Sequence, residues 1–161
     1  MPLDFLQKAK MSALNTMKKN KSKSVHSKKA AEPVGHFPHA RVVGDLLFLS
    51  GIGPRVRGSK EIPGVTLGTN GEIKSHDIKI QCRAVFENVK FILEEASSSW
   101  EQLVDVTVFL THMKEDFAAY NALWAEYFKE NPPCRTTVEV LSLPTPIAIE
   151  LKCVATLQKR G

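Results

Sequence analysis

Hydrophobic positions along the chain follow two periods, and the change from one period to the other predicts the secondary structure. Apolar side chains recur at helical spacing over residues 78–96, directly after Asp77, whose side chain is suited to cap a helix. A second helical stripe follows Asp116 and stops at the prolines 132–133. Alternating, β-branched stretches predict three strands, at residues 104–110, 136–141 and 147–157.

Residues 42–71 are predicted to form a hairpin followed by a long loop. Short apolar runs at residues 42–43 and 46–49 flank Gly44-Asp45, a turn signal. Residues 53–71 hold five glycines and two prolines, which is typical of a loop. The predicted order is therefore β-β-α-β-α-β-β, with both helices on one face of a sheet: an α+β, two-layer domain.

The predicted sheet has apolar side chains on both faces. Leu47 and Leu49 point one way, and Leu46 and Phe48 point the other way. Two helices can cover only one face, and no further element remains in the chain to cover the other. We therefore expect self-association, with closed symmetry as the usual outcome.

The positive charge of the chain is concentrated at its beginning. The 161 residues carry a formal net charge of +5, yet the first 32 residues alone hold eight lysines against two acidic residues. The rest of the chain is thus close to neutral, which argues against nucleic acid as a partner of the folded domain.

Residues 1–33 contain too few apolar side chains to offset the entropy of ordering them. We interpret them as a disordered or partly helical basic arm, with the domain spanning residues 34–161. Serines and few acids are also typical of a mitochondrial targeting segment, although the arm has no arginine. A cytoplasmic location, or a mitochondrial one through the arm, are the two alternatives, and an arm that attracts anions is a third role.

The sequence contains no motif that is typical of a metal-binding or cofactor-binding protein. Phosphate-binding loops, dinucleotide fingerprints and zinc motifs are absent from the sequence, and the five histidines lack metal-ligand spacing. Three cysteines, Cys82, Cys134 and Cys153, indicate free thiols, and no apolar run approaches the roughly 20 residues that span a bilayer. We expect no cofactor, no metal and no membrane contact.

Two charged residues stand at positions that strands normally fill with neutral side chains. Arg135 begins the strand after Pro132-Pro133, and Glu150 interrupts an apolar strand. With these two strands as a hairpin, Arg135 and Glu150 form a structural pair, or Glu150 is an outward-facing carboxylate, or the two residues belong to a functional site. From the residues alone, the structural pair is the simpler interpretation.

Several segments of the chain together resemble the Rid/YjgF family of small enamine/imine deaminases. They include the motif R-T-T-V-E-V-x-x-L-P at Arg135 and lie at residues 40–51, 81–92, 104–110, 117–128 and 134–155. The resemblance extends from about residue 36 to 157. It implies a chorismate-mutase-like fold and a homotrimer with sites between subunits. Within the family, the chain is most similar to the group of 2-aminomuconate deaminases.

This resemblance implies roles for individual residues. Arg135 would bind a substrate carboxylate through its planar fork, and Glu150 would orient or activate water. Ser50 and Gly51 match a substrate-binding Ser-Gly pair, and Asn121 matches a helix asparagine of the family.

One position departs from the family pattern. Phe37 stands where a tyrosine is frequent, so that His39 or water would take over the role of the hydroxyl group. For a dicarboxylate substrate, Arg55 and Arg57 in the long loop are candidates for a second cationic contact, although solvated loop charges are an equal alternative.

The implied reaction hydrolyses an enamine, of the 2-aminomuconate or 2-aminoacrylate type, to a keto product and ammonia without a cofactor. The partners would be a small carboxylate-bearing substrate and two further copies of the chain. A ligand-binding or regulatory protein without catalysis is the alternative. A ribonuclease or translation inhibitor is a third interpretation, which the near-neutral domain does not favour.

Overall fold

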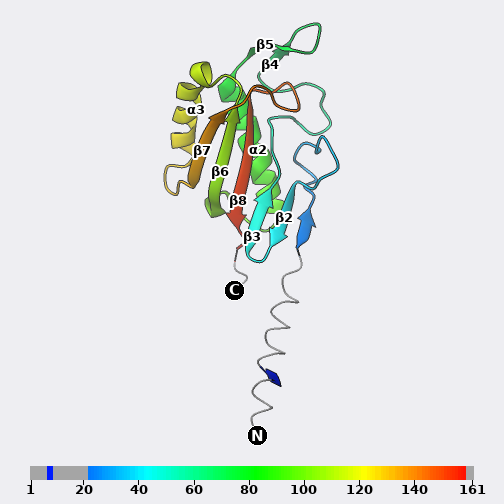
Figure 1. Cartoon of the computed structure of the whole chain (residues 1–161), viewed down its shortest axis with the longest axis vertical. Helices are drawn as coiled ribbons and strands as arrows, with labels where there is room; N and C mark the ends of the chain where they lie inside the picture. Colours follow the sequence, from blue (N-terminus) through cyan, green and yellow to red (C-terminus); the bar gives the residue numbers. More distant parts are fainter. Residues whose placement is uncertain (1–6, 9–21, 159–161) are drawn as a thin grey trace.

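The computed structural model describes residues 7–8 and 22–158, and residues 22–158 form a two-layer α+β domain (Figure 1). A mixed six-stranded sheet has the strand order β1-β2-β3-β8-β6-β7. Its strands are β1 (Lys23–Val25), β2 (Ala40–Val43), β3 (Leu46–Leu49), β6 (Leu103–Leu110), β7 (Cys134–Glu139) and β8 (Ile149–Thr156). A separate hairpin consists of β4 (Val65–Leu67) and β5 (Ile73–His76).

Two helices cover one face of the six-stranded sheet. They are α2 (Ile78–Glu95), which runs behind the sheet in Figure 1, and α3 (Met113–Tyr127), which lies beside β7. The strand residues that face them are buried, as Leu47, Val108 and Leu151 are. The predicted two-layer α+β architecture is confirmed. No helix in the described part of the chain combines the length and the apolar character needed to cross a membrane.

Helix α2 begins as the sequence predicts. The carboxylate of Asp77 accepts hydrogen bonds from the backbone N–H groups of Lys79 and Ile80, which satisfies two free donors of the first turn. The apolar stripe of α2 also contains two buried amides, Gln81 and Asn88. Helix α3 begins earlier than predicted, because His112, and not Asp116, is its N-cap residue.

The predicted hairpin of the last two strands is wrong. Strand β7 pairs in parallel with β6, and β8 pairs antiparallel with the other edge of β6. Parallel strands need a crossover connection, and α3 supplies it between β6 and β7. Arg135 on β7 is consequently separated from Glu150 on β8 by a whole strand.

The structure also changes the boundaries of the arm and the long loop. Residues 22–33 belong to the domain, because β1 pairs with β2 and because Val25, Ser27 and Ala30 are buried. The rest of the expected arm lies outside the described residues, apart from residues 7–8. The long loop contains β4 and continues into β5, so that its last part, residues 65–71, belongs to a hairpin.

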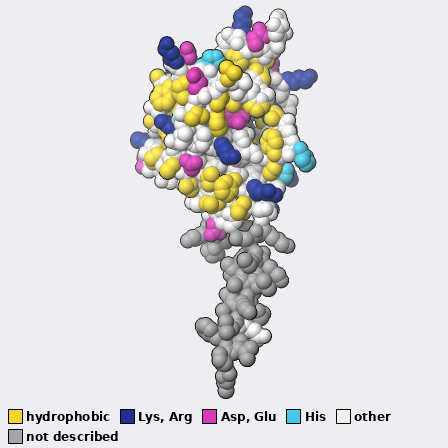
Figure 2. All heavy atoms as spheres, in the orientation of Figure 1, with side chains coloured by type: hydrophobic (Ala, Val, Ile, Leu, Met, Phe, Trp, Pro, Cys, Tyr) yellow, Lys and Arg dark blue, Asp and Glu magenta, His cyan; other side chains and the backbone are white. Residues whose placement is uncertain are grey.

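The second face of the sheet remains open in the single chain. Figure 2 shows hydrophobic side chains gathered on this face of the molecule. Leu46, Phe48 and Val104 are 38%, 40% and 45% exposed there. This exposed apolar surface is the reason for expecting self-association, and the homotrimer stays a prediction.

The buried amide of Gln81 provides a test of the packing between α2 and the start of β8. Its Oε1 accepts a hydrogen bond of 2.7 Å from the backbone N–H of Ala148, and its Nε2 donates to the carbonyl of Pro63. In Gln81→Leu the buried N–H of Ala148 has no partner, and we expect the free energy of unfolding to fall by about 1–3 kcal/mol.

Denaturant unfolding of the Gln81 variant measures this loss. Glu87→Gln on the exposed side of the same helix is the matched control and should change the free energy by less than about 0.5 kcal/mol. Equal stability of the two variants would contradict the role assigned to Gln81.

Candidate functional site

A cavity of about 480 Å³, counting its open mouth, lies between α2 and three chain segments. The segments are residues 30–39, 50–55 and 144–150. Of the residues that the sequence analysis selected, the cavity brings together Phe37, Ser50, Gly51, Arg55 and Glu150.

Glu150 is the only carboxylate that a sheet strand contributes to the lining of this cavity. It lies on the open face of the sheet, opposite Phe109 of β6, and is partly buried. This burial raises the pKa of the Glu150 carboxyl above its usual range. Among the described residues, no cation forms an ion pair with it.

Gly51 has no side chain, and this leaves room for the carboxylate of Glu150. A Cβ atom at residue 51 would lie 2.3 Å from Oε1 and 2.8 Å from Cδ of Glu150. The backbone of residue 51 therefore touches the carboxylate, and only glycine permits this approach. Ser50 fixes the adjacent backbone, because its hydroxyl donates a hydrogen bond of 2.6 Å to the carbonyl of Pro38.

Phe37 and His39 do not supply a proton-transfer group. The ring of Phe37 is 41% exposed and lines the cavity as an apolar wall. The buried His39 accepts a hydrogen bond at Nδ1 from the N–H of Ser27 and donates from Nε2 to the carbonyl of Ala31. Both ring nitrogens are thus committed to the backbone, so that His39 has no free ring nitrogen to offer a ligand in this structure.

Asn88 is a lining residue that the sequence analysis missed. Its Nδ2 donates to the carbonyls of Gly53, at 2.9 Å, and Arg55, at 2.7 Å. Its Oδ1 accepts from the N–H of Ala31. One amide on α2 thereby connects two walls of the cavity. The sequence feature that could have indicated Asn88 is its place on the apolar face of the helix, where a polar side chain needs buried hydrogen-bond partners.

The two loop arginines differ in what they contact. Arg57 does not line the cavity: it donates to the carbonyls of Ser27 and Ala30, both at 2.9 Å, and forms an ion pair with Glu32 at 2.7 Å. Its role in the structure is to attach residues 27–32 to the loop. Arg55 lines the cavity and donates to the carbonyl of Glu32.

Arg135 lies outside the cavity of its own chain, together with Asn121. Its guanidinium stacks over the rings of Tyr120 and Trp124, at 5.5 and 5.1 Å, and donates to Oδ1 of Asn121 at 2.9 Å. Burial raises the pKa of Tyr120 to about 12, which keeps the phenol neutral beneath the cation. The guanidinium is thus held in place without forming an ion pair among the described residues.

Arg135 and Glu150 point to opposite sides of the sheet. Arg135 pairs with Val106, whose side chain is buried beneath the helices, whereas Glu150 pairs with Phe109 on the open face. The structural Arg–Glu pair that the sequence favoured is therefore absent within one chain. Each member is fixed by its own neighbours, and neither forms an ion pair with any residue of segments 7–8 and 22–158.

A family model described as endoribonuclease L-PSP matches residues 27–157. The chain belongs to the Rid/YjgF family. A RutC family protein of Pyrococcus abyssi is 39% identical over 131 residues, which are 81% of this chain and 94% of the relative.

Solved structures of the Rid/YjgF fold agree with this assignment. The yeast protein YEO7 has a TM-score of 0.75 and 28% identity, and the match covers 86% of this chain and all of that one. TdcF of E. coli, solved with bound serine, has a TM-score of 0.71 and 28% identity over 84% of this chain and 99% of its own. The family match begins at residue 27, which agrees with the inclusion of Ser27 and Ala30 in the domain.

The raised pKa of Glu150 leads to a stability prediction. The folded chain holds the Glu150 proton more tightly than the unfolded chain does, so ionisation of this carboxyl at neutral pH disfavours the folded state. Glu150→Gln keeps the shape and removes the charge, and we expect it to raise the free energy of unfolding at pH 7. Below a pH of 4.5, the ordinary pKa of this carboxyl, the difference should disappear. Glu150 is then protonated in the wild-type protein, so that residue 150 is uncharged in both proteins.

Urea unfolding of both proteins between pH 3.5 and 8 measures this difference. Glu126→Gln, at an exposed position on α3, is the control and should show no such pH dependence. A stabilisation by Glu150→Gln that stays constant over the whole range would show that ionisation is not its cause.

Proposed function

We propose that the protein is a cofactor-independent deaminase that hydrolyses an enamine or imine to a keto product and ammonia. The observation that carries this proposal is the unpaired, partly buried carboxylate of Glu150, held against the backbone of Gly51 in a small cavity. Burial raises the pKa of this carboxyl above its usual range, which makes the carboxylate a stronger base, and hydrolysis of an imine requires such a proton acceptor.

The chemistry balances with water as the only co-reactant. The enamine takes up a proton at carbon and loses one from nitrogen to become an imine. Glu150 accepts a proton from a water molecule as the oxygen bonds to the imine carbon, and it returns the proton to nitrogen. The carbinolamine then loses ammonia, and the C–N bond is replaced by a C=O bond. The thiols of Cys82 and Cys153 take no part, because burial raises the pKa of each to about 12.

Arg135 of a neighbouring subunit would complete the site. Arg135 lies on β7, an edge strand, and its guanidinium is oriented by two aromatic rings and by Asn121. Glu150 lies on the opposite face, so the two groups cannot meet within one chain. Association through the open apolar face into a closed homotrimer would bring the edge of one sheet to the cavity of the next.

A carboxylate-bearing substrate fits these two charges. The guanidinium of Arg135 would bind the carboxylate through two parallel hydrogen bonds, with Glu150 at the reacting carbon. The relative TdcF was solved with serine, which also carries a carboxylate. Arg55 is the one loop arginine that lines the cavity, so it would contact a second carboxylate, as in a 2-aminomuconate-type substrate.

Two other functions remain as alternatives to this proposal. A ligand-binding or regulatory protein would use the same cavity and the same arginine without catalysis. The description of the family model names endoribonuclease activity. Two carboxylates, Glu32 and Glu150, line the cavity and would repel the phosphates of RNA, which favours the deaminase.

Mixed oligomers test the shared site. Arg135→Ala and Glu150→Gln should each release ammonia from 2-aminoacrylate at least about a hundredfold more slowly than wild type, because anchoring and general base catalysis are each lost. When the two variants are co-expressed with different tags and mixed oligomers are isolated, one site per trimer regains both native groups. We expect about one third of wild-type activity.

Three outcomes separate the alternatives. No recovery in mixed oligomers would show that the two residues do not share a site across subunits. Undiminished ammonia release by either single variant would rule out the proposed mechanism. Retained serine binding without any ammonia release by the wild-type protein would favour the ligand-binding function. Circular dichroism verifies that each variant is folded.

The contact proposed for Arg55 predicts a change in substrate preference. Arg55→Gln removes the charge and keeps a donor for the carbonyl of Glu32. We expect kcat/KM for 2-aminomuconate to fall at least about tenfold, through the lost charge-assisted contact, while that for 2-aminoacrylate stays nearly constant. Arg83→Gln, at an exposed arginine of α2 that does not line the cavity, is the control and should leave both values nearly constant. Equal losses for both substrates would exclude Arg55 as the second carboxylate contact.

A further inference from the structure

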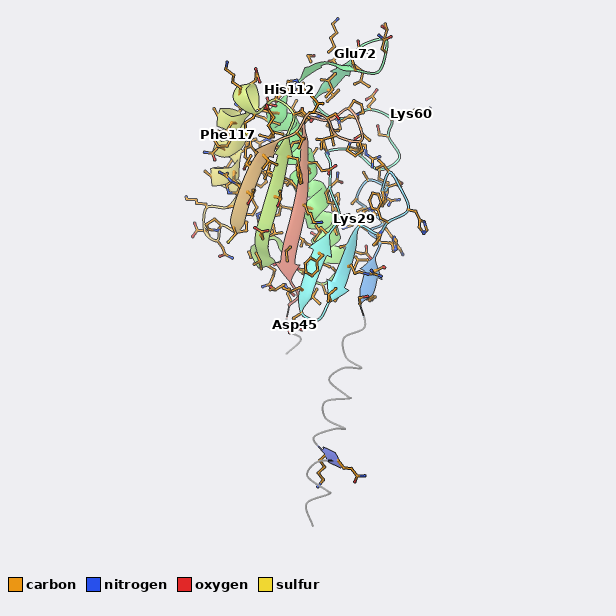
Figure 3. All side chains as sticks on the ribbon, viewed as in Figure 1. Lys29, Asp45, Lys60, Glu72, His112 and Phe117 are labelled. Carbon is orange, nitrogen blue, oxygen red and sulfur yellow. The ribbon has the colours of Figure 1, made fainter. Side chains whose placement is uncertain are left out.

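Two histidines and an aspartate converge at the end of the domain where α3 begins. His76 is the last residue of β5, His112 is the N-cap residue of α3, and Asp116 lies in its first turn. One nitrogen or oxygen atom of each residue lies within 4.8 Å of those of the other two. Figure 3 labels His112 at this end of the sheet, below the hairpin that carries Glu72. None of the three residues lines the cavity of Glu150.

His76 and Asp116 form a hydrogen-bonded pair whose atoms are also suited to bind a metal ion. Nε2 of His76 lies 2.9 Å from Oδ1 and 2.8 Å from Oδ2 of Asp116, and the side chains are only 13% and 7% exposed. The nitrogen is thus almost equally distant from both oxygens. In a tetrahedral zinc site, neighbouring ligand atoms lie roughly 3.4 Å apart. To admit an ion, these two atoms would move apart by about half an ångström, and the most distant of the three ligand atoms, up to 4.8 Å apart, would approach by up to about 1.4 Å.

His112 presents a third ligand atom on the same side. Its Nδ1 lies 2.8 Å from the hydroxyl oxygen of Thr111, so that Nε2 is the nitrogen available to an ion. A hydrogen bond on one ring nitrogen typically orients a histidine that binds metal through the other. The rings of His76 and His112 are 4.8 Å apart between centroids.

The structure assigns no capping task to the His112 side chain. As the N-cap residue it makes no side-chain hydrogen bond to the helix, and the N–H of Met113 donates instead to Oε1 of Glu139. Two acidic residues in the first turn, Glu115 and Asp116, offset the positive end of the helix dipole. The local charge is therefore compatible with a bound cation.

We propose that His76, His112 and Asp116 bind one divalent transition-metal ion, with Zn²⁺ as the best fit to two imidazoles and one carboxylate. Water would fill the fourth position, because His112 is exposed. Spacing along the sequence did not reveal this set, since 36 residues separate the two histidines and only the fold brings them together.

The bound ion would attach the β4–β5 hairpin to α3. The hairpin forms its own two-stranded sheet and is not part of the six-stranded one. The contact between His76 and Asp116 already joins β5 to α3, and a metal ion would add His112 to it. The expected role is stabilisation of this end of the domain, and it does not depend on the proposed deaminase activity.

Zinc titration of the full chain, after removal of metal with a chelator, tests the site. Calorimetry should show one Zn²⁺ per chain, and Zn²⁺ should raise the midpoint of thermal unfolding, whereas Mg²⁺ should not. His112→Ala removes one ligand and leaves the contact of His76 with Asp116 intact. We expect this variant to fold and to bind Zn²⁺ more than about tenfold more weakly.

Two controls and one spectroscopic signal make the test specific. His36→Ala removes an exposed histidine outside the cluster, and Cys134→Ser removes the exposed thiol; both should bind Zn²⁺ as the wild type does. Co²⁺ in place of Zn²⁺ should give the visible absorption of a four-coordinate site, and His112→Ala should abolish it. Absence of one-to-one binding, or equal affinity in wild type and His112→Ala, would overturn the proposal.

Discussion

The hydrogen bonds of two amides on α2 hold the functional part of the molecule together. Gln81 and Asn88 lie two turns apart on the helix face that packs against the sheet. Asn88 joins the carbonyl of Gly53 to the N–H of Ala31, and Gln81 binds the N–H of Ala148 just before β8. Each of the three segments around the cavity thus has at least one backbone group that is satisfied by an amide of one helix. The position of Glu150 depends on this arrangement.

Local patterns in the sequence predicted well where most helices and strands lie, and they predicted poorly which strands pair. Asp77 and the apolar stripe after it located α2 almost to the residue, because capping and helical periodicity are local properties. Strand β1 has only three residues, and one of them is buried, so no alternation was available to reveal it. The pairing of β7 with β6 is a long-range property that no period in the sequence encodes.

The same distinction applies to the site. Gly51 and Glu150 lie together, as the family resemblance implied, whereas Arg135 stands on the opposite face of the sheet. A single chain therefore carries two fixed and opposite charges that cannot neutralise each other. Such an arrangement costs folding stability, and association that brings the charges close would recover part of that cost. The proposed homotrimer would both bring these two charges together and cover the open apolar face.

The central place of β8 bears on how the domain is made in the cell. β8 follows every other strand in the chain, yet it lies between β3 and β6 and is the only link between the two halves of the sheet. During synthesis the first strands emerge from the ribosome long before their partner does. Until residues 149–156 have been translated, the edges of β3 and β6 stay unpaired and open to other chains. Formation of the complete sheet therefore has to wait for the last strand of the domain to be made.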